Sequence, residues 1–414
     1  MIQIQTGWDR YHRPLMGKHD ASFMISCFAE SQKRVPIHAG FFLDVSESMG
    51  RDGRLSHAKE FILSLLNNLQ NGDHFTLATF HGRVTLFADD ETLTDQNRPL
   101  LAERIRSLEA GGVTRLDLAL ETIRDRMKSS GELLRFTFLV SDGFPTDKDG
   151  YQVTDEQSYL NIAAQVGQQG KPLIVVAFGN PDSYNPVFFN AVAEKTQGSF
   201  RYSPDAHQLV ASLNEDIRRM NITRVGNVRI VFELDPTLAS CNWVGRAYPD
   251  KQLLVPVEKQ TYILGSLCIG DPVVLIANIS SYGDLDTTSG EHRLGTVRMV
   301  ANTQTGCWKQ HLVLSQDYTN RSDLIEYRDE TVHRWYLELE ETAQLRKAVQ
   351  AITERRTTEA EQHINAARST RQSLGKAINE LDDLRRTLTR DNGDGVARLL
   401  ELARLSRFSH RGDR

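Results

Sequence analysis

The 414-residue chain lacks several features that would place it in a specialised class of protein. It has four cysteines, and they are scattered without the Cys-x-x-Cys spacing of zinc and redox sites. We therefore expect buried or half-buried thiols, which are typical of proteins in the reducing cytoplasm. No run of ~18 apolar residues occurs, so a transmembrane helix is not expected. The amino-terminal residues also lack the basic start and apolar core of a secretion signal.

The charge balance and the motif content exclude further functions. The formal net charge of -5 disfavours non-specific binding to nucleic acid or to an anionic membrane, so we expect neither as a partner. The sequence contains no G-x-S-x-G nucleophile motif, no P-loop and no G-x-G-x-x-G dinucleotide motif. With 40% hydrophobic and 25% charged residues, the composition is that of an ordinary globular protein of about two or three domains.

One stretch combines a buried-strand pattern with a cluster of oxygen-bearing side chains. The run Ile37–Leu43 is largely apolar and ends at Asp44, which Ser46 and Ser48 follow. Alternate side chains of this segment point the same way. Three oxygen donors on one face of a tight loop are what a hard cation prefers. The pattern therefore predicts a metal site at the end of this strand.

Two later stretches have the composition to complete such a site. Thr114 follows a Gly-Gly turn in Gly111–Asp117, and Asp142 ends a second apolar run in Leu139–Gly143. Together with the first stretch they would supply two charged carboxylates and three neutral hydroxyls. These oxygens suit Mg²⁺, with Ca²⁺ or Mn²⁺ as alternatives. Because most of the donors are neutral, we expect a bound ion to remain electrophilic.

Residues 35–221 show near-continuous apolar strands that alternate with helical patterns. This alternation predicts an α/β domain with a doubly wound, mainly parallel sheet. Ligands of such sheets bind at the carboxyl ends of strands, near the topological switch point. Asp44 and Asp142 both stand at such ends. Helices are expected at Arg54–Leu69, Arg98–Leu108, Leu116–Met127, Glu156–Val166, Val187–Ala193 and His207–Met220.

Residues 222–320 change to short strand patterns with no helix between them, which predicts an antiparallel β-sandwich. The patterns lie at Val228–Phe232, Leu253–Val257, Tyr262–Leu267, Val273–Ile279, Leu294–Val300 and His311–Leu314. Residues 1–34 hold two more strand patterns, which cannot form a domain alone. We expect them to join the sandwich, so that the α/β domain is an insertion within it.

Residues 321–414 are rich in Glu, Arg, Ala, Leu and Gln, and their apolar residues recur at helical spacing. This pattern predicts a carboxyl-terminal helical hairpin or small bundle. We interpret the apolar stripes as intramolecular core. A partner-binding or coiled-coil face is the alternative.

The order of the five oxygen donors resembles the metal-ion-dependent adhesion site of von Willebrand factor A domains. The matching positions are Asp44, Ser46, Ser48, Thr114 and Asp142. The resemblance covers about Val35–Met220. The family usually has a small residue where this chain has Glu47, whose carboxylate either weakens binding of an anionic ligand or points to solvent. The whole arrangement is similar to bacterial A-domain proteins with a flanking sandwich and a helical tail, and the flanking sandwich resembles that of inter-alpha-trypsin inhibitor heavy chains.

The resemblance implies a non-catalytic, Mg²⁺-dependent module that binds an acidic residue of a partner protein. It suggests an adaptor in a bacterial cytoplasmic multiprotein system, with partners such as MoxR-type AAA+ ATPases or kinases and phosphatases. Two alternatives stay open. One is a metal-dependent phosphatase or other hydrolase that uses the same loop, although haloacid-dehalogenase-type phosphatases need a second Asp where this chain has Ser46. The other is a structural scaffold that acts through the helical tail.

Overall fold

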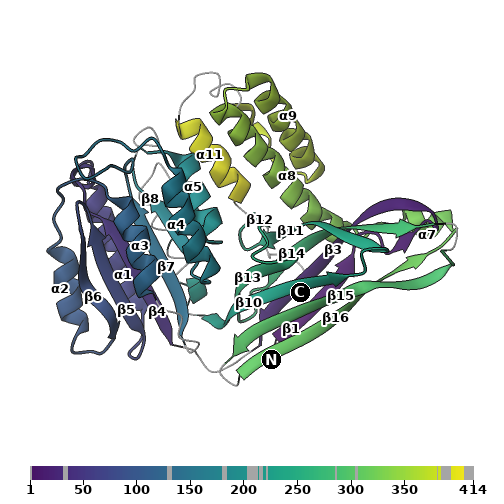
Figure 1. Cartoon of the computed structure of the whole chain (residues 1–414), viewed down its shortest axis with the longest axis horizontal. Coiled ribbons are helices and arrows are strands. Elements are labelled where there is room, and N and C mark those ends of the chain that lie inside the picture. Colours follow the sequence, from purple (N-terminus) through teal and green to yellow (C-terminus); the bar gives the residue numbers. More distant parts are fainter. Residues whose placement is uncertain are drawn as a thin grey trace. The chain divides into compact units, whose positions relative to one another are not determined.

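The computed structural model describes residues 2–30, 36–127, 133–179, 184–202, 213, 218–220, 222–284, 287–303, 306–379, 381–383 and 393–404. The chain folds into two compact units (Figure 1). The sandwich unit comprises Met1–Gln32, Arg224–Thr389 and Leu402–Arg414, and the α/β unit comprises Lys33–Thr223 and Arg390–Glu401. Most of the expected helix His207–Met220 lies outside the described residues.

The α/β unit is built on a six-stranded sheet with the order β6-β5-β4-β7-β8-β9. Its neighbouring strands are parallel except for the antiparallel pair β5–β6, so the predicted fold class is confirmed. The strands are β4 (Ile37–Asp44), β5 (His74–Phe80), β6 (Val84–Thr92), β7 (Leu134–Ser141), β8 (Leu173–Ala177) and β9 (Ser199–Tyr202). The helices are η1 (Glu47–Gly50), α1 (Arg54–Asn68), α2 (Arg98–Arg106), α3 (Leu116–Arg126), α4 (Gln157–Gln168) and α5 (Pro186–Lys195).

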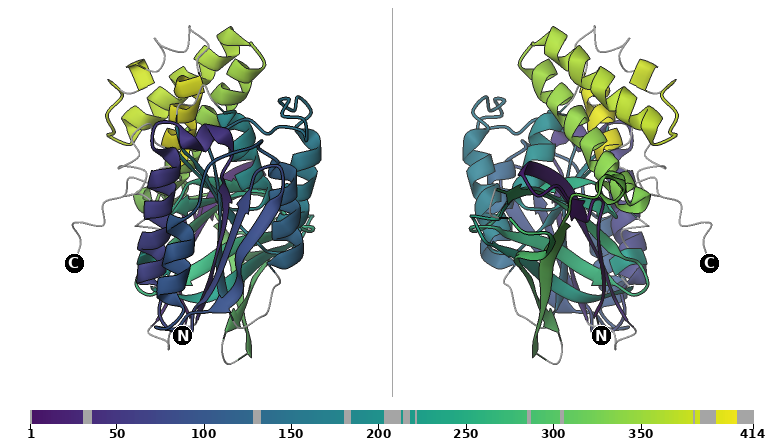
Figure 2. Two further views of the ribbon diagram at one scale, coloured as in Figure 1. Left: turned by 90° about the vertical axis from the view of Figure 1, so that its left-hand side faces the viewer. Right: turned by 90° about the vertical axis from the view of Figure 1, so that its right-hand side faces the viewer.

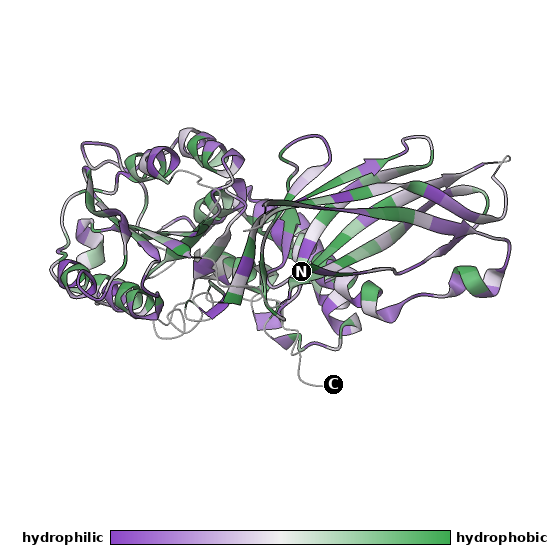
Figure 3. Ribbon diagram, turned by 90° about the horizontal axis from the view of Figure 1, so that it is seen from below, coloured by the Kyte–Doolittle hydropathy of each residue, from purple (hydrophilic) through white to green (hydrophobic). Residues whose placement is uncertain are grey.

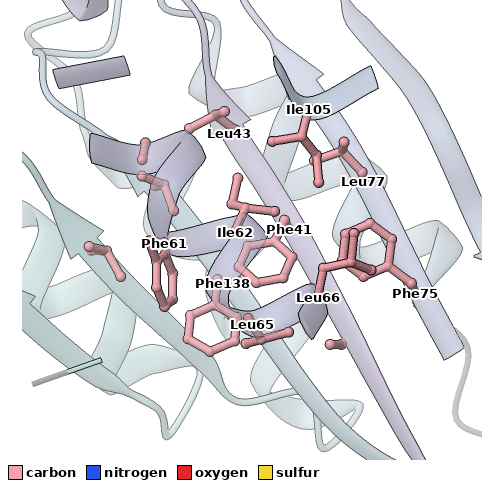
Figure 4. Close-up of a cluster of buried hydrophobic side chains, with 14 of the residues drawn as sticks. Phe41, Leu43, Phe61, Ile62, Leu65, Leu66, Phe75, Leu77, Ile105 and Phe138 are labelled. Carbon is pink, nitrogen blue, oxygen red and sulfur yellow. The ribbon is translucent and has the colours of Figure 1, made fainter. Parts of the chain in front are cut away.

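The central strand β4 is buried along its whole length because helices cover both faces of the sheet. On one face, Phe41 stacks on Phe138 of β7 with ring centroids 4.8 Å apart (Figure 4). Phe61 of α1 meets both rings edge-on. On the other face, Phe42 packs in a second core with α3, α4 and α5. The chain passes from β4 to β5 on one side and returns to β7 on the other, which puts the topological switch point between β4 and β7.

The sandwich unit contains two five-stranded sheets, with the orders β1-β3-β14-β11-β12 and β13-β10-β15-β16-β2. The amino-terminal strand β3 pairs with β14, so residues before the α/β unit join strands that follow it, as predicted (Figure 2). Hydrophobic and hydrophilic residues alternate along its long strands (Figure 3). The strands are β1 (Ile2–Trp8), β2 (His12–Arg13), β3 (Gly17–Ala29), β10 (Thr223–Leu234), β11 (Ala239–Tyr248), β12 (Gln252–Leu254), β13 (Thr261–Cys268), β14 (Val273–Gly283), β15 (Gly290–Thr303) and β16 (Gly306–Tyr318).

Two details of the sandwich differ from the sequence prediction. The sequence patterns did not predict strand β11. In the structure it pairs with both β12 and β14. The expected strand Leu253–Val257 is shorter and shifted, because β12 ends at Leu254 and Val255 is exposed.

The carboxyl-terminal region is helical, as predicted. Its helices are α7 (Ser322–Glu326), α8 (Glu330–Thr353), α9 (Thr357–Ser373) and α11 (Gly393–Arg404). The apolar stripe of α8, including Trp335 and Leu339, packs on Ala247 and Ile276 of the first sandwich sheet. This stripe is therefore intramolecular core. Within the described part of the chain, no helix is both long and apolar enough to span a membrane.

Candidate metal centre

The two predicted carboxylates lie at the carboxyl ends of adjacent strands. Asp44 is the last residue of β4, and Asp142 directly follows β7. The two strands are hydrogen-bonded in parallel register, so their ends meet at one edge of the sheet. Both residues are fully buried. The sheet therefore brings two residues about a hundred positions apart to its switch point.

The serines of the first loop connect these strand ends. Ser48 Oγ donates a hydrogen bond to Asp142 Oδ1 at 2.7 Å. Ser46 Oγ lies 3.1 Å from Ser48 Oγ, and the Ser46 amide donates to Asp44 Oδ1 at 2.8 Å. Four of the five predicted donors thus belong to one continuous network.

Backbone hydrogen bonds fix the loop that carries Thr114 beside the serine loop. The Gly111 amide donates to the Val45 carbonyl at 2.7 Å, and the Glu47 amide donates to the Gly112 carbonyl at 3.1 Å. Each loop therefore holds the other at the sheet edge. Such pairing is needed because Val45 lies beyond the end of β4 and Glu47 is the first residue of η1, where a helix leaves its backbone amides without partners of its own.

Thr114 itself is anchored by a second loop that follows Asp142. Its amide donates to Thr146 Oγ1 at 2.8 Å, and the Thr146 amide donates back to the Thr114 carbonyl at 2.8 Å. A Cβ placed on Gly143 would lie 3.4 Å from Ser48 Oγ and 3.8 Å from Thr114 Oγ1. The hydroxyls of Ser48 and Thr114 therefore both lie next to the position of this missing Cβ, which Gly143 leaves unfilled.

Burial makes the carboxylate of Asp44 costly to ionise. It raises the pKa of Asp44 to about 7, while hydrogen bonds from Ser141 and Ser46 act in the opposite direction. Ser141 Oγ donates to Asp44 Oδ2 at 2.6 Å. The nearby charge of Asp142 adds to the increase in pKa. Two buried carboxylates whose charges repel in this way are stabilised by a positive charge near both of them.

Sequence reasoning missed one charged residue of this centre. Arg54 Nη1 donates to Asp142 Oδ2 at 2.6 Å, and the Arg54 side chain is 11% exposed. Arg54 is the first residue of α1, where the helix dipole disfavours a cation. A basic residue at a helix amino terminus, shortly after a strand-ending Asp, is a signal that could have indicated an acidic partner.

The extra carboxylate in the first motif points to solvent. The Glu47 side chain is 82% exposed, and its Oε1 lies 3.9 Å from Nη2 of Arg51, which is also exposed. Of the two readings of Glu47, the structure therefore supports the solvent-facing one.

Two hydrogen-bonded oxygen pairs of the centre have separations that a small divalent cation could also accept. Adjacent ligands of an octahedral Mg²⁺ site lie roughly 3 Å apart, given metal–oxygen distances of ~2.1 Å. The separations of 3.1 Å from Ser46 Oγ to Ser48 Oγ and of 2.7 Å from Ser48 Oγ to Asp142 Oδ1 are close to that value. Among the described residues, no group of three or more His, Cys, Asp or Glu side chains could hold a metal ion. The candidate centre is thus one of hydroxyls with two carboxylates.

Comparison with known sequences identifies the kind of domain that carries these residues. A family model for the von Willebrand factor type A domain matches residues 40–215. The chain is 26% identical over 278 residues to the protein sll0103 of Synechocystis sp., a match that covers 65% of this chain and 62% of that protein. It is 24% identical over 254 residues to YfbK of Escherichia coli, covering 59% of this chain and 41% of YfbK. The chain therefore spans only part of the length of each relative.

Two solved structures share the fold over nearly the whole chain. A von Willebrand factor type A protein from Catenulispora acidiphila superposes with a TM-score of 0.77 at 14% identity, covering 98% of this chain and 97% of that one. The ArnB paralog VWA2 from Sulfolobus acidocaldarius gives a TM-score of 0.64 at 16% identity, covering 97% and 98%. At these identities the likeness concerns the fold alone.

Proposed function

Because the chain carries a von Willebrand factor type A domain, we propose that it is a non-catalytic module that binds an acidic residue of a partner protein through a divalent cation. Mg²⁺ is the preferred ion, with Ca²⁺ or Mn²⁺ as substitutes. The observation that carries the proposal is the convergence of oxygen donors from three loops at the switch point of the sheet. The residues that would hold the ion are Asp44, Ser46, Ser48, Thr114 and Asp142.

The composition of the donor set supports binding of an anionic group. Three of the five donors are neutral hydroxyls, so the protein only balances the charge of a divalent ion. The ion would act as a Lewis acid toward one further oxygen ligand, which a partner's Asp or Glu would supply. Gly143 leaves room for this ligand beside the hydroxyls, because a Cβ there would lie 3.4 Å from Ser48 Oγ and 3.8 Å from Thr114 Oγ1.

The same contacts support a role without catalysis. A phosphatase that used Asp44 as a nucleophile would need an acid at position 46, and Ser46 instead hydrogen-bonds within the loop. The apolar stripe of α8 is buried on the sandwich, so no observation favours a scaffold that acts through this stripe. We propose an adaptor in a bacterial cytoplasmic multiprotein system, with an AAA+ ATPase or a kinase or phosphatase as the partner class.

The proposal is tested by affinity capture with the full-length chain as bait. Wild type should retain a partner from an extract of the cells that encode it when Mg²⁺ is present, and should lose it on chelation. Asp44→Asn should retain none at any Mg²⁺ concentration while keeping its circular dichroism spectrum. Glu47→Gln, a matched change at an exposed carboxylate, should behave as wild type. Capture that survives chelation, or that survives Asp44→Asn, would contradict the proposal.

A further inference from the structure

Arg54 contacts a proposed metal donor, and the proposed function gives it no role. Its Nη1 lies 2.6 Å from Asp142 Oδ2, and the carboxylate is fully buried. A buried, charge-assisted hydrogen bond of this length is among the strong polar contacts of proteins. The Arg54–Asp142 pair is therefore part of the centre, and its charge would affect a bound ion.

The guanidinium group of Arg54 is held from three sides. Nη1 bonds to Asp142, and Nη2 donates to Asp52 Oδ2 at 3.2 Å. On the third side is the backbone of Gly179, which has a φ of +96°. A Cβ at Gly179 would lie 2.7 Å from both Cζ and Nε of Arg54, so a larger residue would push the guanidinium away. The glycine at position 179 thus leaves the space that the planar guanidinium group of Arg54 occupies.

The two oxygens of Asp142 have separate partners. Oδ1 accepts from Ser48 Oγ and faces the hydroxyl network, whereas Oδ2 accepts from Arg54. An ion bound among the hydroxyls would meet Oδ1. Arg54 can keep Oδ2 at the same time, so the metal and the arginine need not compete for one oxygen.

The net charge of the centre indicates the effect of Arg54 on a bound ion. Asp44 and Asp142 together balance a divalent cation and would leave the loaded centre neutral. Arg54 also contacts the carboxylate of Asp52, but that side chain is 80% exposed, so solvent screens its charge. With Arg54 retained, the buried part of the loaded centre is therefore positively charged. We propose that Arg54 is a permanent counter-cation, a specificity-determining residue that weakens metal binding and strengthens binding of a partner's carboxylate to the metal-loaded centre. This inference rests on the proposed function.

The test compares the full-length wild type with Arg54→Gln by titration calorimetry. Removal of a charge one carboxylate away from the ion should strengthen Mg²⁺ binding by about tenfold. The Mg²⁺-saturated variant should bind a short peptide with a single glutamate about tenfold more weakly than wild type. Arg51→Gln removes the same charge three residues earlier in the chain, but Arg51 is 68% exposed and lies beside Glu47. It should change neither affinity.

A second variant separates charge from folding. Arg54→Lys keeps the positive charge without the planar fork, so its Mg²⁺ affinity should stay near that of wild type. The proposal is overturned if Arg54→Gln binds Mg²⁺ no more tightly than wild type, or if Arg54→Lys gains the same affinity as Arg54→Gln. Wild type that binds no Mg²⁺ would overturn the proposed function as well, whereas Mg²⁺ binding that ignores Arg54 would overturn this inference alone.

Discussion

Asp142 shows how a single residue can serve two neighbours at once. Its position just after β7 is set by the buried strand, and its two oxygens face different groups, Ser48 and Arg54. Because the Asp142 side chain is fully buried, solvent screens these two contacts less than it would screen contacts at the surface. The chemistry of the centre therefore depends on which partner each oxygen keeps.

The residue scale also explains what the sequence could and could not predict about the centre. The five oxygen donors were predicted because strand ends and hydroxyl spacing are local patterns. The role of Arg54 was not predictable in this way, because the local sequence marks it only as the start of a helix. Its partner Asp142 is 88 residues away, so the contact depends on the order of strands in the sheet.

A second buried residue of β4 makes stability depend on pH. Burial lowers the pKa of His38 to about 4 from 6.5, although Asp90, 3.5 Å from Nδ1, acts in the other direction. Between these pH values the unfolded chain binds more protons than the folded chain. The free energy of unfolding therefore has its full value above about pH 6.5. It decreases as the pH falls toward 4, by at most about 3 kcal/mol.

This prediction can be checked by urea unfolding of the full-length chain at pH 7 and pH 5. Wild type should lose stability relative to His38→Asn as the pH decreases, because the variant has no imidazole to protonate. His311→Asn, a change at an exposed histidine, should keep the pH dependence of wild type. Parallel pH profiles for wild type and His38→Asn would show that His38 does not cause the effect.

At the scale of elements, strands buried on both faces were the most predictable. The cores of β4, β7 and β8 are near-continuous apolar runs, and their positions in the sequence agree with the structure to within about two residues. Strand β11 escaped prediction for a physical reason. Its pairing with β14 shifts register between Cys241 and Trp243 and again between Arg246 and Tyr248, which breaks the alternation that indicates a strand.

The packing of α8 on the sandwich includes a buried cluster of charges that sequence reasoning did not find. Glu338 and Glu341 of α8 are almost fully buried. Lys376 Nζ bonds to both, at 3.0 Å from Glu341 Oε2, and Lys251 Nζ lies 3.4 Å and 3.7 Å from them. Arg371 Nη1 is 3.6 Å from Glu341 Oε1. Burial lowers the pKa of Lys251, and the two glutamates oppose this decrease.

Removing one anion from this cluster should be strongly destabilising. Glu341→Gln leaves Glu338 as the remaining carboxylate of a cluster with Lys251, Lys376 and Arg371, and an uncompensated buried charge costs about 3 kcal/mol. The urea midpoint of the full-length chain should decrease accordingly. Glu354→Gln removes an exposed carboxylate just beyond the end of the same helix and should leave the midpoint unchanged. Equal midpoints for Glu341→Gln and wild type would mean that the cluster contributes nothing to stability.

At the scale of the whole molecule, the insertion of one unit into another was predictable, and its details were not. Two strand patterns before the α/β unit could not form a domain alone, so they had to pair elsewhere. The structure pairs β3 with β14 over Gly17–Cys27 and Val273–Gly283. The order of the ten sandwich strands could not be read from the sequence, because it depends on contacts between segments up to about 300 residues apart.

Direct binding of a paramagnetic ion tests the central claim, that five oxygens from three loops hold one divalent cation. Electron paramagnetic resonance would follow Mn²⁺ added to the metal-free full-length chain, with Mg²⁺ as competitor. The account predicts a single saturable Mn²⁺ site in wild type that Mg²⁺ displaces, and its loss in both Thr114→Ala and Asp142→Asn. No saturable site in wild type, or a site that persists in both variants, would contradict it.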